Sequence, residues 1–424
     1  MPTLSEDLRR RGLVHQMTHP DRLTALLDGR GMVGYIGFDP TADSLHVGHL
    51  QQICLLRRLA DAGHRPIALI GGGTGMIGDP SGRSEERNLL DHNEIASNAK
   101  GVAVQLGRFL DFGPGEAILV DNVDWLGQVA LIDFLRHVGK LFSVNEMVRK
   151  DSVRVRLEGA EQTLSFTEFS YMLLMAWDYV QLFDRYDCTL QLGGSDQWGN
   201  ITEGIDLVRR SRGAQVFGLT SPLVTKADGT KFGKTATGTV WLDDKRTSPY
   251  QFFQFWFGTT DPEVGPLLRR FTFLELEELD ALDRSVAEHP ERRDAQRTLA
   301  RQVTALVHGV DEAARAERAA EVLFTEDVAT LDLVTLTAAL SDAPTTAVDA
   351  DEIAGMDLVD VLTRSGLSPS RRDARQQLGS GAVWVNNRRQ GEGATLSSTD
   401  ALHGRYVILR RGRKTMHVLA VRGH

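Results

Sequence analysis

The sequence predicts an α/β protein built on a parallel sheet. Three stretches carry this prediction, namely residues 35–50, 67–83 and 188–210. Each reads as a buried strand that ends in a polar or glycine-rich turn, and the first and third continue into a helix. Units of this kind bring their turns together at the carboxyl ends of the strands, where α/β folds bind ligands. We therefore expect the three turns to form one binding site.

Composition and charge restrict the possible classes. A chain of 424 residues predicts two or three domains. The net charge of -9 argues against nucleic-acid binding over the whole surface, but residues 371–413 are rich in arginine and suggest a localised partner. Cys54 and Cys188 lack any CxxC spacing, so we expect two small buried side chains rather than a disulfide or zinc site. Without a signal region or membrane-length apolar stretch, a cytoplasmic protein is expected.

The first stretch places two histidines at a predicted helix start. An apolar run over residues 32–38 ends in a polar turn, and an amphipathic helix is predicted over 50–59. His46 and His49 share one face, and Gly48 leaves room for a group to approach the backbone. A helix N-terminus favours negative charge, above all a phosphate that gains charge in a transition state. The alternative is a pair of solvated histidines.

The second stretch holds a glycine-rich turn. Gly73, Gly75 and Gly78 match the GxGxxG pattern of dinucleotide-binding proteins, but residues 79–82 break the helix which that pattern requires. A Walker loop is excluded because no Lys-Ser/Thr pair follows Gly78. A dehydrogenase is therefore a distant alternative. The turn presents three candidate ligand residues, Asp79, Arg83 and Arg87, although taken alone the two arginines favour a solvated helix face.

A helix predicted over residues 165–179 carries Tyr171, Met175 and Asp178 on one face. Two polar groups among apolar neighbours either line a pocket or mark the wet edge of a core helix, and the second arrangement is commoner. The elements predicted before this helix are helices over 92–112 and 126–138 and a strand over 117–120.

The third strand, predicted over residues 188–192, ends at Gly193 and Gly194. These glycines permit a ligand to approach the backbone closely, and Asp196 is suitably placed for ribose hydroxyls. The alternative is a helix cap by Ser195 or Asp196.

A cationic loop follows at residues 222–238. Lys226, Lys231 and Lys234 alternate with glycines, which suits a leaving polyphosphate, although lysine-glycine loops are also common on surfaces. Residues 248–324 read as helices with an aromatic core, and 343–351 as a linker.

From about residue 353 a small domain is predicted, whose arginines suit contacts with an RNA backbone. Its predicted elements are helices over 358–365 and after 370, strands over 382–385, 406–410 and 416–421, and a turn at Asn386 and Asn387.

Taken together, the motifs resemble those of bacterial tyrosyl-tRNA synthetases over essentially the whole chain. Residues 46–49, HVGH, are similar to the HIGH motif of class I synthetases, and residues 231–235, KFGKT, to the KMSKS motif. GFDPTADSLHVGHL, GDPSGR, SFTEFSY, GGSDQWGNI and KADGTKFGKT are together very specific. The resemblance implies a homodimer with three domains. The domains are a Rossmann-like catalytic domain with a dimer-forming insertion (1–222), an α-helical domain (248–330) and an S4-like RNA-binding domain (353–424). A KFGKT loop (223–247) and a linker (331–352) connect them.

By the same resemblance, the expected reaction is tyrosine–tRNA ligation in two steps. The tyrosine carboxylate attacks the α-phosphorus of ATP, and the tyrosyl group then passes to the 3′-terminal adenosine of tRNA(Tyr). ATP brings Mg²⁺ with it, and no tightly bound cofactor or structural metal is implied. The alternative from another class is a non-catalytic RNA-binding paralog, but an idle copy has no reason to keep both HVGH and KFGKT.

The resemblance also implies roles for single residues. The substrate phenol would contact Tyr35 and Asp178. Its ammonium and carboxylate would contact Asp79, Asn122, Tyr171, Gln191 and Gln197. The ATP side would comprise Gly37, Asp39, Thr41, His46, Gly48, His49, Gly194, Asp196, Lys231 and Lys234. Developing charge would be stabilised by Thr41, His46 and His49, and pyrophosphate held by Arg83, Arg87, Lys231, Lys234 and Thr235. RNA contacts would come from Arg371, Arg372, Arg375, Arg388, Arg410 and Arg411.

Two positions depart from the family pattern. Arg83 replaces a lysine, which keeps the charge but changes its geometry. Met175 replaces a glutamine that helps to bind the tyrosine ammonium, and methionine is only a weak acceptor. Met175 indicates neutral drift, a duplicate copy whose reshaped pocket resists a tyrosine-mimicking inhibitor, or a shift to another amino acid. Tyr35 and Asp178 favour a phenolic substrate in all three cases.

Overall fold

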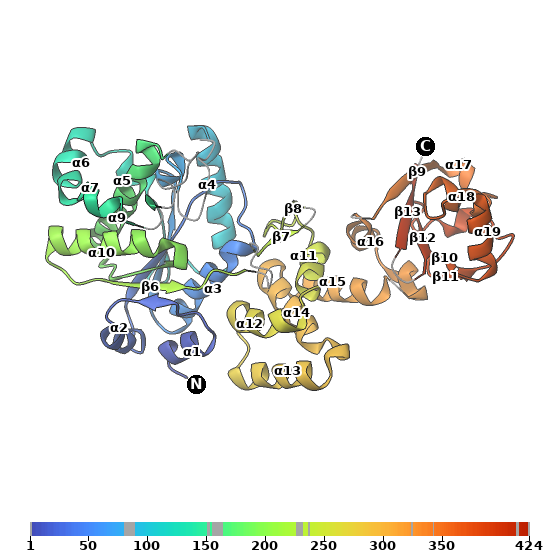
Figure 1. Ribbon diagram of the computed structural model, residues 1–424, viewed down its shortest axis with the longest axis horizontal. Helices are drawn as coiled ribbons and strands as arrows, with labels where there is room; N and C mark the ends of the chain where they lie inside the picture. Colours follow the sequence, from blue (N-terminus) through green and yellow to red (C-terminus); the bar gives the residue numbers. More distant parts are fainter. Residues whose placement is uncertain are drawn as a thin grey trace. The chain divides into compact units, whose positions relative to one another are not determined.

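The computed structural model describes residues 2–79, 90–150, 153–154, 164–225, 232–235, 238–323, 325–341, 343–412 and 415–422. The chain forms two compact units, Met1–Thr247 with Gly258–Leu299 and Ser248–Phe257 with Ala300–His424 (Figure 1). The first unit contains a six-stranded sheet and the second a five-stranded sheet. None of the described helices is long and apolar enough to cross a membrane.

A six-stranded sheet forms the centre of the first unit. Its strands are β1 (Gln16–Met17), β2 (Val33–Phe38), β3 (Arg65–Ile70), β4 (Ile118–Asp121), β5 (Leu190–Gly194) and β6 (Phe217–Ser221). They lie in the order β1-β6-β5-β2-β3-β4, and every neighbouring pair is parallel except β1 with β6. The predicted parallel α/β sheet is therefore confirmed, with β2 at its centre. The edge strand β1 and its partner β6 had no counterpart in the prediction.

Helices pack against this sheet. The helices of the first unit are α1 (Leu4–Arg10), α2 (Pro20–Leu27), α3 (Val47–Asp61), α4 (His92–Leu106), α5 (Val123–Leu126), α6 (Leu131–His137), α7 (Val144–Met147), α9 (Phe166–Tyr186), α10 (Trp198–Arg212), α12 (Asp261–Phe271) and α13 (Leu276–Glu288). Helix α14 (Asp294–His308) spans the boundary between the units. Side chains of α9 and α10 form a buried core with Tyr35, Ile67 and Leu69 of the sheet, so α9 is held directly beside β2.

Helix α3 begins three residues before the predicted start. His46 caps it, and the apolar side chains of Leu50, Ile53 and Cys54 are buried on the face that the periodicity predicted. Both Cys54 and Cys188 are buried free thiols, as expected, and burial raises the pKa of each to about 12. Neither thiol is therefore reactive at neutral pH.

Two predicted helices are shorter than expected, and in each case a glycine lies at the changed end. The helix predicted over residues 92–112 is α4, which ends at Leu106 with Gly107 as its C-cap. The helix predicted over 126–138 is α6, which starts only at Leu131, because Gly127 caps the short preceding helix α5. Glycine ends helices readily because it lacks a Cβ and costs backbone entropy in a helix.

The second unit combines helices with a mixed sheet. Its helices are α11 (Pro249–Phe257), α15 (Val310–Val322), α16 (Leu333–Leu340), α17 (Ala350–Ile353), α18 (Leu358–Arg364) and α19 (Arg371–Gly379). Its strands are β9 (Thr345–Asp349), β10 (Val383–Val385), β11 (Arg388–Gln390), β12 (Tyr406–Arg411) and β13 (Thr415–Arg422), in the order β11-β10-β12-β13-β9. The predicted turn is present, with positive φ at Asn386 and Asn387.

The segment predicted as a linker, residues 331–352, instead holds α16 and β9. Strand β9 pairs in parallel with β13 and buries Val348 in the core of the second unit. Residues 343–351 are rich in Pro, Thr, Ala and Asp, which is typical of a linker. Only pairing with a strand some 70 residues later in the chain, with Thr345 opposite Val418, makes part of this segment a strand.

Candidate active site

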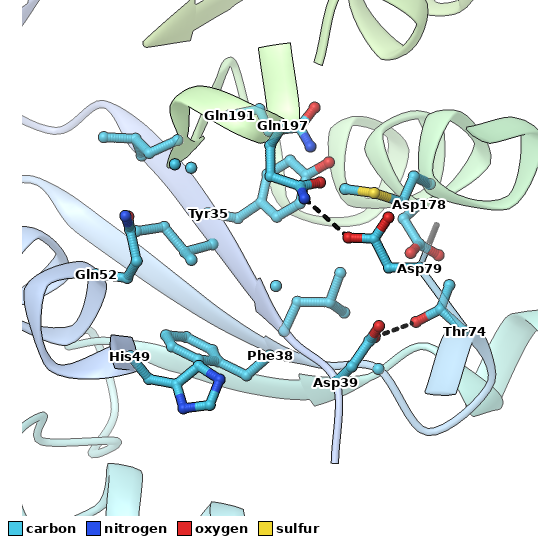
Figure 2. Close-up of a pocket in the computed structure, with 18 of the residues that line it drawn as sticks. Tyr35, Phe38, Asp39, His49, Gln52, Thr74, Asp79, Asp178, Gln191 and Gln197 are labelled. Atoms are coloured by element: carbon cyan, nitrogen blue, oxygen red, sulfur yellow. Dashed lines mark hydrogen bonds between the residues drawn. The ribbon is translucent and has the colours of Figure 1, made fainter. Parts of the chain in front are cut away.

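A pocket of the first unit lies at the carboxyl ends of β2, β3 and β5 (Figure 2). Its walls also include α3 and α9. The residues that line it are Tyr35, Ile36, Gly37, Phe38, Asp39, Thr41, Gly48, His49, Gln52, Leu69, Gly71, Thr74, Asp79, Asn122, Tyr171, Met175, Asp178, Gln191, Leu192, Gly193, Gly194, Asp196, Gln197 and Leu223. The three turns therefore meet in one pocket, as the strand–turn pattern predicted.

At one end of this pocket, Tyr35 and Asp178 are both buried, with exposures of 0% and 2%. Among the described residues, no group hydrogen-bonds the Tyr35 hydroxyl. Burial, with the nearby Asp178 carboxylate as the next cause, raises the pKa of Tyr35 well above its usual value. The phenol of Tyr35 therefore stays protonated and can both donate and accept a hydrogen bond.

The Asp178 carboxylate is held by two donors. Nε1–H of Trp125 donates to Oδ1 at 2.7 Å, and the side-chain amide of Asn122 donates to Oδ2 at 2.9 Å. Burial raises the pKa of Asp178 to about 7, although both hydrogen bonds act to lower it. The carboxylate therefore titrates near neutral pH and, when ionised, is oriented by two fixed partners.

Hydrogen bonds continue from Asn122 to a second carboxylate. The amide of Asn122 also donates to Thr74 Oγ1 at 3.0 Å, and Thr74 Oγ1 donates to Asp39 Oδ1 at 2.8 Å. The Tyr171 hydroxyl donates to the other oxygen, Asp39 Oδ2, at 3.0 Å. Asp178 and Asp39 are thus joined by a continuous chain of side-chain hydrogen bonds. We call Trp125, Asp178, Asn122, Thr74 and Asp39 the carboxylate network.

The glycine turn that follows β3 supports this network rather than a dinucleotide. A Cβ on Gly71 would lie 2.0 Å from Asp39 Oδ1, so only glycine fits beneath that carboxylate. After the turn the chain makes only a short 3-10 helix, Thr74–Met76, and Gly78 has a φ of +86°. The long helix that the GxGxxG fingerprint requires is absent from this described stretch, which agrees with our rejection of that reading.

The neighbouring wall of the pocket carries amide groups. The amide of Gln197 donates to Asp79 Oδ2 at 2.8 Å (Figure 2). It also accepts from the amide of Asn200 at 3.0 Å. Gln191 is buried, and no described group hydrogen-bonds its Oε1. Met175 lines the same pocket. All eight residues expected to contact tyrosine therefore line the pocket: Tyr35, Asp79, Asn122, Tyr171, Met175, Asp178, Gln191 and Gln197.

At the other end, His46 and His49 are fixed by the first turn of α3. The backbone N–H of Gly48 donates to His46 Nδ1 at 3.0 Å, and the N–H of His46 donates to His49 Nδ1 at 3.2 Å. Because each Nδ1 is an acceptor, each neutral imidazole carries its proton on Nε2. The two rings lie 4.0 Å apart, and a Cβ on Gly48 would come within 2.7 Å of the His46 ring. The histidines are therefore not simply solvated, and their Nε2–H groups are suited to donate to an anion.

The expected ATP side is only partly covered by the described residues. Gly37, Asp39, Thr41, Gly48, His49, Gly194 and Asp196 line the pocket. His46 is not among the lining residues but contacts the ring of His49, which is. The predictions for Arg83, Arg87 and Lys231 lie outside the described residues, as do the side chains of Lys234 and Thr235.

Among the side chains with polar groups, Gln52 and Thr74 line the pocket and Trp125 hydrogen-bonds Asp178, but none of the three had a part in the prediction. Gln52 lies three residues after His49, so helix periodicity could have placed it on the same face. Trp125 lies in α5, the short helix after β4, whose carboxyl end had to lie at the edge of the sheet where the other turns gather. Thr74 gave no signal, since it is an ordinary residue in a glycine-rich turn.

The six arginines of the second unit that we expected to contact RNA fall into two groups by exposure. Arg372, Arg375 and Arg388 are exposed, as RNA contacts require. Arg371 is exposed too but forms an ion pair with Asp360 at 2.8 Å.

Arg410 and Arg411 are only half-exposed and hydrogen-bond within the unit. A guanidinium N–H of Arg410 donates to Asn387 Oδ1 at 2.7 Å, and one of Arg411 donates to the carbonyl of Leu367. These two arginines therefore help to stabilise the second unit itself.

Comparison with known proteins agrees with this geometry. A family model described as "tRNA synthetases class I (W and Y)" matches residues 28–325, and one described as "Tyrosine--tRNA ligase SYY-like C-terminal domain" matches residues 335–419. The chain is 48% identical over 424 residues to the tyrosine–tRNA ligase of Roseiflexus castenholzii, covering 99% of both chains. It is 49% identical over 420 residues to that of Geobacillus stearothermophilus, covering 98% of this chain and 99% of the relative.

Solved structures show the same fold. A C-terminally truncated mitochondrial tyrosyl-tRNA synthetase of Aspergillus nidulans matches with a TM-score of 0.69 and 30% identity, covering 76% of this chain and 95% of that one. Fold and site thus define a class I aminoacyl-tRNA synthetase. Within that class, the chain belongs to the tyrosine–tRNA ligase family of aminoacyl-tRNA ligases.

Proposed function

We propose that the pocket activates L-tyrosine with ATP and that the chain then transfers the tyrosyl group to the 3′-terminal adenosine of tRNA(Tyr). In the first step, a carboxylate oxygen of tyrosine attacks the α-phosphorus of ATP, whose bond to pyrophosphate breaks. In the second step, a ribose hydroxyl of the tRNA attacks the tyrosyl carbonyl carbon, and AMP leaves. Neither step needs a nucleophile from the protein, so the protein contributes positioning and charge stabilisation. Mg²⁺ enters as part of the ATP substrate.

One observation carries the choice of a phenolic amino acid, namely the buried pair of Tyr35 and Asp178. A substrate phenol can donate to the ionised Asp178 carboxylate and accept from the Tyr35 hydroxyl, which no described residue hydrogen-bonds. Phenylalanine would leave the Tyr35 hydroxyl buried without a partner and would deny the Asp178 carboxylate the additional hydrogen bond from a phenol, at about 1–3 kcal/mol for a neutral group and more for a charged one. A site built around a hydroxyl in this way strongly rejects the analogue that lacks it.

The amino and carboxyl groups of tyrosine would lie beside Asp79, Tyr171, Gln191 and Gln197. Asp79 supplies negative charge for the ammonium and is already held by Gln197 at 2.8 Å. Gln191 offers a buried amide that can donate to the carboxylate. Met175 adds only a weak sulfur acceptor here, so the ammonium relies on the neighbouring oxygens.

The phosphates of ATP would lie toward the first turn of α3. The fixed Nε2–H groups of His46 and His49 would donate to the oxygens that gain charge at the α-phosphorus, together with Thr41. Asp196, Gly194 and Gly37 would face the nucleoside. Pyrophosphate would be held by the cationic residues of the two glycine-rich loops, Arg83, Arg87, Lys231 and Lys234, with Thr235.

The second unit would bind tRNA through residues 353–424. Its exposed arginines, Arg372, Arg375 and Arg388, supply positive charge for phosphates. The test is the salt dependence of tRNA(Tyr) binding. Arg375→Ala should weaken binding and reduce the slope of log K against log salt by about one, whereas the exposed Gln376→Ala should leave both unchanged.

A homodimer would cover an apolar surface on the first unit. Leu131 and Ile132 of α6 are 68% and 72% exposed, and Val144 of α7 is 62% exposed. Such exposed apolar side chains are typical of protein interfaces. Sedimentation velocity of the wild type and of Ile132→Asp tests this. A dimer that the aspartate converts to monomer is expected, and a wild-type monomer would contradict it.

The proposed reaction is tested by tyrosine-dependent exchange of pyrophosphate into ATP, without tRNA. We expect fast exchange with tyrosine, slow exchange with 3-hydroxyphenylalanine and almost none with phenylalanine. A preference for another phenol would indicate a retuned pocket. No exchange with any of them, together with intact RNA binding, would favour a non-catalytic paralog instead.

A further inference from the structure

Trp241 lies opposite His46 in a short antiparallel pairing. The backbone of residues 240–242 hydrogen-bonds to that of residues 45–47, with N···O distances of 3.1 Å and 2.9 Å. Directly opposed residues of an antiparallel pair project to the same face, which brings the two rings together. Their centroids are 6.0 Å apart at an angle of 70°. His46 thus has an aromatic neighbour from the segment that follows the KFGKT motif itself, residues 231–235.

The His46 imidazole is therefore contacted on more than one side. Its Nδ1 accepts from the backbone of Gly48, and the ring of His49 lies 4.0 Å from it, tilted by 32°. Trp241 approaches it at a steep angle. A rotation of the imidazole would break the hydrogen bond from Gly48 or press the ring against one of the two aromatic neighbours. The direction of Nε2–H is fixed by this enclosure.

Trp241 is itself held in place. The guanidinium carbon of Arg246 lies 4.3 Å from the centroid of the indole, a cation–π distance. Arg246 also forms an ion pair at 2.8 Å with Asp43, three residues before His46. The backbone N–H of Trp241 donates to Thr247 Oγ1 at 3.0 Å. These contacts connect the two ends of the short pairing through side chains as well as backbone.

Gly233 of the KFGKT motif packs against Val47, the first residue of α3. Gly233 has a φ of +88°, and a Cβ there would lie 2.4 Å from Val47 Cγ2, so only glycine fits. The N–H of Val240 donates to the carbonyl of Gly233 at 3.0 Å, and the N–H of Val47 donates to the carbonyl of Val240. The loop backbone and the first residue of α3 are therefore in direct contact.

We propose that Trp241 is a positioning residue for His46, and that Arg246 and Asp43 hold the indole in place for this purpose. Trp241 is not among the residues that line the pocket, so it acts through the imidazole and not on the substrates. The inference rests on the proposed role of His46 in stabilising charge at the α-phosphorus. The consequence is specific: loss of the indole should slow adenylate formation and leave tyrosine binding intact.

The test compares Trp241→Leu with Trp241→Phe in the full-length protein. Leucine fills much of the space without an aromatic ring, whereas phenylalanine keeps the ring contact with His46. Single-turnover tyrosyl-adenylate formation should slow about tenfold in Trp241→Leu and about threefold or less in Trp241→Phe, as expected for a small misplacement of a catalytic group. Equilibrium binding of tyrosine should stay within about twofold of wild type in both variants. An equal loss of tyrosine binding would show a merely structural role and overturn the proposal.

A double-mutant cycle with His46→Ala separates the role of Trp241 from the role of His46. If Trp241 acts through His46, then adding Trp241→Leu to His46→Ala should cause no further loss of rate. Full additivity would overturn the role of Trp241 while leaving the proposed function of His46 intact. If His46→Ala alone has no effect on adenylate formation, the proposed role of His46 fails, and the inference about Trp241 fails with it.

Arg246 provides a smaller effect with a matched control. Arg246→Ala should slow adenylate formation about two- to threefold, since cation–π and surface ion-pair contacts contribute little individually. Lys245→Ala removes an exposed cation from the same turn without touching the indole and should leave the rate unchanged. Equal effects of the two substitutions would mean that general loss of positive charge, not the indole contact, is responsible, and would contradict the role of Arg246.

Discussion

The two ends of the pocket are built by different means. At the phenol end, the carboxylate network joins Trp125, Asp178, Asn122, Thr74 and Asp39 through side-chain hydrogen bonds between residues far apart in the sequence. At the histidine end, the side chains are oriented by backbone N–H groups within four consecutive residues, 46–49. The first end is buried, whereas the histidines are only half-buried.

This difference matches two different tasks. Rejection of a wrong amino acid requires buried groups that are costly to leave unpaired, and the phenol end has them. Stabilisation of charge that appears only in the transition state requires donors whose direction is fixed in advance. The first turn of a helix provides such donors, because its backbone N–H groups orient nearby side chains. Substitutions at the histidine end should therefore slow adenylate formation, and substitutions at the phenol end should reduce the affinity for tyrosine and the selectivity against phenylalanine.

The largest effect is expected for His46→Ala. Loss of one preorganised donor should slow adenylate formation by about 10²–10³ while tyrosine binding stays nearly unchanged. Stopped-flow measurement of adenylate formation and equilibrium dialysis of tyrosine test the two parts separately. His92→Ala, at an exposed helix start on α4, is the matched control and should behave as wild type. Normal stopped-flow rates in His46→Ala would refute the assignment.

The next largest effect is expected for Asp178→Asn. A neutral amide cannot accept from both Trp125 and Asn122 as the carboxylate does, and it is a weaker acceptor for a phenol. Loss of a hydrogen bond to a charged group should lower kcat/KM for tyrosine by about 10²-fold, or about 3 kcal/mol. The value for phenylalanine should change much less, so selectivity falls. Asp124→Asn, an exposed isosteric change on α5, serves as control. Equal losses for both amino acids would contradict a phenol-specific role.

A pH dependence follows from the same carboxylate, whose pKa is raised to about 7. If the phenol donates to ionised Asp178, protonation below pH 7 weakens binding, and tyrosine affinity without ATP should be about tenfold lower at pH 6 than at pH 8. Asp178→Asn should abolish this dependence. An affinity independent of pH in the wild type would show that the protonated acid binds equally well.

The raised pKa of Asp178 also makes the stability of the folded protein depend on pH. Because the pKa of Asp178 is higher in the folded protein than its ordinary value of 3.8, folding binds a proton there. Its contribution to stability is greatest below about pH 4 and is lost as the pH rises through about 7. The ionised Asp178 carboxylate to which the phenol would donate therefore lowers the stability of the folded protein.

The smallest effect is expected for Met175→Gln. A glutamine at this position would add an acceptor for the tyrosine ammonium, worth about 1 kcal/mol and so about a fivefold lower KM in pyrophosphate exchange. If KM hardly changes, Met175 is neutral drift. If the substitution changes which phenol is preferred, or restores sensitivity to a tyrosine-mimicking inhibitor, the wild-type pocket has been retuned.

Much of the architecture was visible in local pattern. The apolar runs before Asp39, Gly71 and Gly193 predicted the buried strands β2, β3 and β5, because parallel strands covered on both faces are apolar throughout. Helix ends were less accurate, since Gly107 and Gly127 cap helices that periodicity alone would continue. Strand β9 was missed, because its composition is that of a loop and its partner is distant in sequence.

The sequence by itself determined the histidine end of the pocket. Residues 46–49 contain the cap, the glycine and both imidazoles, and the hydrogen bonds that orient the two rings are between near neighbours along the chain. Interactions of this range depend only on helix geometry, which sequence periodicity reports.

Only the tertiary structure decided the carboxylate network and the place of Trp241. Asp178 meets Asn122 and Trp125 across more than 50 residues, and Trp241 meets His46 across nearly 200. Such contacts depend on which strands are neighbours and on how the chain returns to them. Strand order and chain return arise from packing of the whole unit, so no local pattern reports them.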